Sequence, residues 1–158
     1  MNQTAKPLTI FLFNNSRDLF SRRAHSILLK HLSDCSSQVV QVVPALENKE
    51  INIIVSEGRT IRGMNRKFRG VDASTDVLSF PLDDSVFGEV WLCPSVIESN
   101  AHRFNQSFEN ELLRICIHGI LHLAGYDHKK AFYEHEKQPE VMFKLQEQIH
   151  SGVISSRG

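Results

Sequence analysis

Apolar runs and helix-spaced apolar positions alternate along the chain, and together they predict a small sheet flanked by helices. Short apolar or β-branched runs predict three strands, at residues 8–13, 39–43 and 51–55. Two more strand-like segments, 76–80 and 89–93, are separated by a turn-prone stretch, so we expect them to pair as a hairpin.

Helical spacing and capping residues mark the other elements. The predicted helices span residues 17–32, 56 to about 68, 94 to about 104, 111–124, and a last segment that has Pro139 in its first turn. We expect Ser56 to cap the second of these helices, and Ser107 or Asn110 to cap the fourth. The predicted fold class is α+β, a small mixed β-sheet flanked by helices in an αβα arrangement.

The segment 111–124 is apolar around most of its helical wheel and has one narrow polar stripe. The stripe consists of Glu111, Arg114, His118 and His122. A helix that is apolar on most sides is central and buried, so we expect its histidines to line an internal cleft.

The two histidines of this stripe, together with a third beyond it, predict a metal site. His118 and His122 are four residues apart, so both imidazoles project from one face of the helix. Gly125 can adopt the left-handed conformation that ends a helix, and can thereby return His128 toward the other two. Three nitrogen ligands leave one position open on a single Zn²⁺ ion, as in catalytic sites. Hydrogen-bonded core histidines are the alternative, and the joint spacing favours the metal.

The spacing HxxxHxxGxxH is shared with the metzincin metallopeptidases. In those enzymes a glutamate directly after the first histidine is the general base. Gly119 occupies that position here. We therefore rank a zinc peptidase below hydrolysis of another kind of bond.

Five segments carry a resemblance to the YbeY family of bacterial single-strand-specific endoribonucleases. They are MNRKFRG from Met64, STDVLSFP from Ser74, GEVWL from Gly88, HGILHLAGYDH from His118 and EVMFKLQEQI near the C-terminus. The resemblance covers about the last two-thirds of the chain, in the order of the family. One departure is Ser74, where the family usually has proline.

The resemblance implies an αβα fold, rRNA processing and maturation of the small ribosomal subunit. It implies zinc ligation by His118, His122 and His128, and a functionally important arginine at Arg69. The implied partners are single-stranded RNA, in particular rRNA, and the small ribosomal subunit. A non-catalytic assembly factor whose zinc only stabilises the fold is a further alternative. Neither the oligomeric state nor the general base follows from the sequence, and Asp127 suits a turn or a histidine-orienting role as well as catalysis.

A local basic face accompanies this site on a chain whose formal net charge is +0. It is formed by Arg59, Arg62, Arg66 and Arg69, opposite the apolar residues Ile61, Met64 and Phe68. A solvated helix surface is the alternative reading. Beside a nuclease site we expect phosphate contact, foremost from Arg69.

The length of 158 residues suits a single metallo-hydrolase domain, which we expect at residues 1–150 with a flexible C-terminal tail at 151–158. The three cysteines, Cys35, Cys93 and Cys116, are odd in number and show no CxxC spacing. They are typical of a reducing compartment, and the apolar run near the N-terminus is too short for a signal peptide or a membrane span. We therefore expect a cytoplasmic protein with no membrane partner.

Overall fold

A four-stranded mixed sheet is the centre of the computed structural model, which describes residues 7–82, 86–126 and 138–156. Its strands are β1 (Thr9–Asn14), β2 (Glu50–Val55), β3 (Val77–Pro81) and β4 (Gly88–Leu92). In the order β1-β2-β4-β3, the first three strands are parallel neighbours and β3 pairs antiparallel with β4. This pairing confirms the predicted hairpin and leaves β1 and β3 at the two edges.

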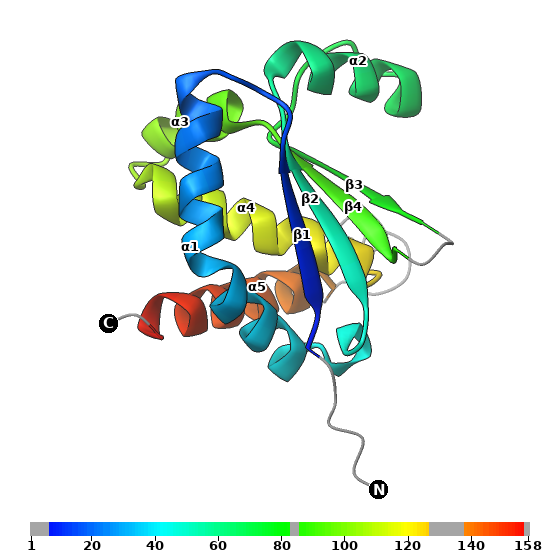
Figure 1. Cartoon of the computed structure of the whole chain (residues 1–158), viewed down its shortest axis with the longest axis vertical. Coiled ribbons are helices and arrows are strands. Elements are labelled where there is room, and N and C mark those ends of the chain that lie inside the picture. The colour runs from blue at the N-terminus through cyan, green and yellow to red at the C-terminus, as the bar shows by residue number, and fades with distance from the viewer. Residues whose placement is uncertain (1–6, 83–85, 127–137, 157–158) are drawn as a thin grey trace, which may run out of the picture.

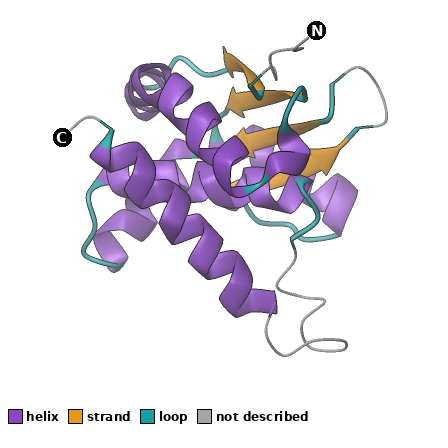
Figure 2. Ribbon diagram, turned by 90° about the horizontal axis from the view of Figure 1, so that it is seen from below, coloured by secondary structure: helices purple, strands orange, loops and turns teal. Residues whose placement is uncertain are grey.

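Five α-helices and a short 3₁₀ turn accompany the sheet within the described residues. They are α1 (Leu19–Val42), η1 (Pro44–Leu46), α2 (Gly58–Arg69), α3 (Pro94–Arg103), α4 (Phe108–Leu123) and α5 (Gln138–Ser155). Figure 1 shows α1, α4 and α5 gathered beside the strands, with α2 above one end of the sheet. Seen from below in Figure 2, most of the helices lie together on one side of the strands.

Alternating strand residues build a separate apolar cluster on each face of the sheet. Ile53 and Val90 pair across β2 and β4 and belong to the main core shared with α1, α4 and α5. On the other face, Ile61 of α2 packs with Leu78 and Cys93 in a smaller cluster. Helices therefore flank the sheet, and the predicted α+β fold class is confirmed.

The strand predicted at residues 39–43 is wrong. Residues 39–42 form the last part of α1, and Val43 is its C-cap residue. Val39 is fully buried in the main core, so packing of one long helix face overrides the local β preference of the valines.

The ends of two other helices also differ from expectation. Ser56 does not cap α2, because Glu57 is the N-cap residue and Ser56 is buried one position earlier. The helix α5 continues through Ser155, and Val153 is buried in the core, so most of the expected C-terminal tail is helical. Throughout the three described ranges, the helices lack the combination of length and apolar character that crossing a membrane requires.

Candidate active site

The helix α4 carries two of the candidate ligands, and its ends are fixed by local sequence. Ser107 caps the N-terminus, as one of the two predictions has it, and its hydroxyl accepts a hydrogen bond from the amide of Asn110 at 3.1 Å. The helix therefore begins at Phe108, three residues earlier than expected. At the other end Gly125 has a φ of 97°, which confirms the predicted left-handed conformation.

The imidazoles of His118 and His122 meet on the polar stripe of α4. Their rings are edge to face with centroids 4.6 Å apart, and their Nε2 atoms are separated by 3.0 Å. Two nitrogen ligands at 2.0–2.1 Å from one tetrahedral zinc would lie about 3.3 Å apart. The two nitrogens therefore converge as donors to a single ion must.

The ring of His118 is oriented by a residue from another helix. Its Nδ1 lies 2.8 Å from Oε1 of Gln146 on α5, a side chain that is itself buried. An amide oxygen can only accept, so Nδ1–H donates, and the lone pair of His118 is on Nε2, toward His122. This is the tautomer that a ligating imidazole needs.

The third predicted ligand, His128, and the nearby Asp127 lie outside the described residues. Among the residues that are described, no three histidine, cysteine or carboxylate side chains are grouped as a metal site would require. The described part of the candidate centre is thus the pair His118 and His122.

The position of Gly119 accounts for the missing glutamate. A Cβ atom added there would lie 2.6 Å from Cγ1 of Val90 and 3.1 Å from Cγ2 of Val77. The backbone carbonyl of Gly119 also accepts a hydrogen bond from the hydroxyl of Ser79 at 2.9 Å. This residue faces the sheet at a close helix–strand contact, where a glutamate side chain has no room.

We expect Gly119→Ala to lower the free energy of unfolding by about 1–3 kcal/mol, because the added methyl overlaps the packed Val90 side chain. Urea unfolding of the purified protein measures this change. Gly63→Ala is the matched control: it is also a helical glycine, but nothing lies within 4 Å of an added Cβ. That control is expected to stabilise by about 0.5–1 kcal/mol. Equal effects of the two substitutions would contradict the close contact.

Arg69 reaches the same cleft from the other side of the sheet. It is the last residue of α2, and the next residue, Gly70, is the C-cap with a φ of 71°. The cleft, of about 630 Å³, is lined by Arg69, His118, His122 and residues 75–81 along β3. Residues that are 49 positions or more apart in the chain are thus brought together, as the predicted site requires.

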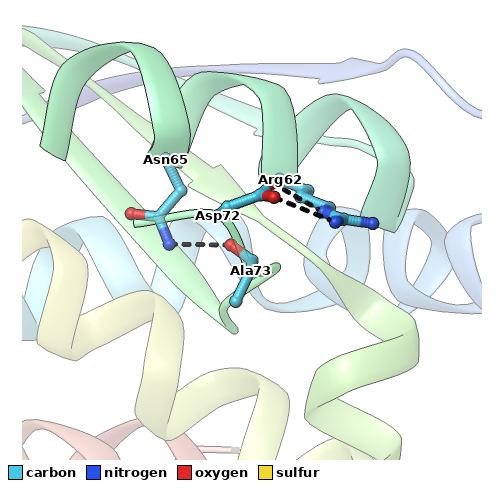
Figure 3. Close-up of polar contacts among 4 residues, drawn as sticks. All are labelled: Arg62, Asn65, Asp72 and Ala73. Atoms are coloured by element: carbon cyan, nitrogen blue, oxygen red, sulfur yellow. Dashed lines mark hydrogen bonds and ion pairs between the residues drawn. The ribbon is translucent and has the colours of Figure 1, made fainter. Parts of the chain in front are cut away.

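The loop between α2 and β3 is tied to the helix by side chains, as Figure 3 shows. The Asn65 amide group donates to the carbonyl of Ala73 at 2.8 Å. The Arg62 guanidinium binds both carboxylate oxygens of Asp72, at 2.9 and 3.1 Å. These contacts hold the end of α2, and with it Arg69, against the start of β3.

The pairing with Asp72 changes the predicted basic face. Arg62 forms an ion pair with the Asp72 carboxylate, so its guanidinium is less available to a phosphate than the sequence pattern indicates. Asp72 is only ten residues from Arg62, but it follows the helix C-terminus, where the helical wheel has no position for it. Arg59, Arg66 and Arg69 are exposed on α2.

Arg114, another member of the polar stripe, joins α4 to α5. The Arg114 guanidinium donates to Glu147 at 2.9 Å, one residue after Gln146. Glu111 is buried, and this burial is the main cause that raises the pKa of its carboxyl; Arg114 opposes the shift. Sequence patterns missed Gln146 and Glu147, since nothing in a helical wheel says which polar residues of one helix face those of another.

Comparison with known proteins shows which family and which structures this chain is similar to. A family model described as Endoribonuclease YbeY matches residues 14–153. A Thermotoga neapolitana protein named Endoribonuclease YbeY is 45% identical over 119 residues, with 75% of this chain and 76% of that protein covered. A Thermotoga maritima protein of the same name is 43% identical over 122 residues, covering 77% of each. A solution structure of a Thermotoga maritima protein matches with a TM-score of 0.66 at 33% identity, over 94% of this chain and 91% of that one.

Proposed function

This chain belongs to the YbeY endoribonuclease family, and from that premise we propose that it is a zinc-dependent endoribonuclease specific for single-stranded RNA. Its role is the processing of rRNA during maturation of the small ribosomal subunit. The observation that carries the proposal is the convergence of His118, His122 and Arg69 on one cleft. A metal-binding pair beside a guanidinium suits a reaction in which negative charge develops on phosphorus oxygens.

His118, His122 and His128 are the proposed ligands of one zinc ion. The converging Nε2 atoms of the first two support this assignment, and the spacing beyond Gly125 supports the third. When bound, zinc would act as a Lewis acid on a phosphoryl oxygen or activate a water molecule. Arg69 would bind the same phosphate, because its planar guanidinium matches two phosphate oxygens at once.

Peptide hydrolysis is the weaker candidate. The metzincin base would have to extend from position 119, and that position faces Val90 and Val77 of the sheet. No glutamate is among the described residues that line the cleft, where the carboxylate is that of Asp76, directly before β3.

Incubating the purified, zinc-verified protein with three substrates tests the proposed function. The substrates are a single-stranded RNA, the same sequence as a duplex, and an unstructured polypeptide. We expect cleavage of the single strand alone. Cleavage of the polypeptide with intact RNA would assign the site to a peptidase, and zinc-loaded protein that cleaves none of the three would favour a non-catalytic assembly factor.

We expect Gln146→Leu to weaken zinc binding by about 10- to 100-fold, because Nδ1–H of His118 loses the acceptor that orients the ring. Competition with a chromogenic chelator measures the affinity. Gln146→Glu retains an acceptor and should restore most of it. Gln148→Leu is the matched control, an exposed glutamine two residues further along α5. Unchanged affinity in Gln146→Leu would show that the hydrogen bond does not orient the ligand.

A further inference from the structure

The cleft has two aromatic side chains beside its charged groups. Phe68, in the last turn of α2, is 58% exposed, and Phe80 extends from β3. Their ring centroids lie 5.3 Å apart with an interplanar angle of 63°. Both rings line the same cleft as Arg69, His118 and His122.

The two rings differ in how firmly they are held. Phe80 packs on the smaller apolar cluster, which includes Leu78, and is only partly exposed. Phe68 meets the ring of Phe80 edge to face and leaves more than half of its own surface to solvent. A fixed ring that supports an exposed one makes a preformed apolar surface at the cleft, available to a flat ligand.

Positive charge lies directly beside this surface. Arg69 follows Phe68 in the chain, and the Lys67 ammonium lies over the Phe68 ring, 5.2 Å from its centroid. A nucleotide of a single strand offers the complementary pair of features, a flat base and a phosphate. In a duplex the bases are already stacked on one another, so only an unpaired base can use such a surface.

We propose that Phe68 and Phe80 form a base-stacking subsite that holds one unpaired nucleobase of the RNA beside the phosphodiester bound in the cleft. The inference rests on the proposed function and adds its source of single-strand preference. Arg69 would bind the reacting phosphate beside the histidines that hold the proposed zinc, and the aromatic pair would select a strand whose base is free to leave the helix.

Cleavage kinetics of Phe68→Leu test the subsite. Leucine keeps an apolar side chain but has no flat face, so we expect KM for a short single-stranded RNA to rise about tenfold, with little change in kcat. Phe68→Trp retains a stacking face and should retain the wild-type KM. Because duplex RNA does not use the surface, its binding should be the same in the leucine variant and in the wild-type protein.

Phe104→Leu is the matched control. Phe104 is 59% exposed and has a cationic side chain over its ring, with the Arg103 guanidinium carbon 5.7 Å from the centroid, but it does not line the cleft. Its variant should show wild-type kinetics. Circular dichroism verifies that all three variants are folded.

Abasic substrates connect the side chain to the base. A series of RNAs, each lacking one base near the cleavage site, should contain one member for which wild-type protein and Phe68→Leu have the same KM. If wild-type protein cleaves RNA but Phe68→Leu keeps its KM, the subsite is wrong and the exposed ring is left as a contact for a protein partner. A defect of Phe68→Leu that persists with every abasic RNA would also overturn it. Wild-type protein that cleaves no RNA would instead overturn the proposed function, and the subsite with it.

Discussion

In the His122→Ala variant we expect zinc binding and RNA cleavage to be lost together. The Nε2 atom of His122 lies 3.0 Å from that of His118, so its removal takes away one of two converging nitrogens. The loss of zinc affinity should exceed the roughly 10- to 100-fold effect of losing an outer partner of a ligand. Cleavage should fall by more than the roughly 10²- to 10³-fold that a single electrostatic group contributes.

Metal content by atomic emission and cleavage of a labelled single strand measure the two losses in one preparation. His102→Ala is the control, since His102 is an exposed histidine on α3 outside the cleft. It should retain zinc and activity. Stoichiometric zinc in purified His122→Ala would show that the ligand set is wrong, and full cleavage after complete removal of zinc by a chelator would show that the reaction does not use it.

The second large effect is expected from Arg69→Ala, which should keep zinc but lose turnover. Arg69 lines the cleft with the two histidines but is not one of the proposed zinc ligands. Its proposed task is to stabilise charge on the phosphorus oxygens, so kcat/KM should fall by about 10²- to 10³-fold. Arg69→Lys keeps the charge without the two-pronged geometry and should recover only part of the loss.

Arg59→Ala separates this local role from the general attraction of a basic helix. Arg59 is exposed at the other end of α2 and does not line the cleft. Its removal should weaken RNA binding modestly, and high salt should abolish the difference. If both arginine variants lowered kcat/KM equally, Arg69 would have no special position in the reaction.

The helix α4, which carries His118 and His122, could be predicted well because its signals are local. The polar stripe that contains His118 and His122, the Ser107 cap and the left-handed Gly125 depend on neighbours within a few residues. The strand predicted at residues 39–43 was wrong because the structure there depends on distant contacts. The β-branched run from Val39 favours a strand locally, but burial against distant helices and strands makes it the end of α1.

Contacts between different helices and strands could not be predicted from the spacing of residues in the sequence. Gln146 faces His118 from a helix 28 residues later, and Asp72 pairs with Arg62 only after the chain has turned at Gly70. The sequence shows that Gly119 stands where metzincins have their glutamate. The reason that a larger side chain does not fit there is steric, and it depends on Val90, 29 residues earlier in the chain. Each of these facts requires the packing of the whole fold.

The bond between His118 and Gln146 also joins metal occupancy to the placement of the last helix. Zinc bound as proposed would favour one orientation of the His118 ring, and that orientation is the one in which α5 supplies the acceptor. By linkage, docking of α5 and binding of the proposed zinc would favour each other by one and the same coupling free energy. Amide exchange along α5 would then be slower in the zinc-bound protein than in the zinc-free protein, and would measure occupancy of the proposed site at the C-terminal helix.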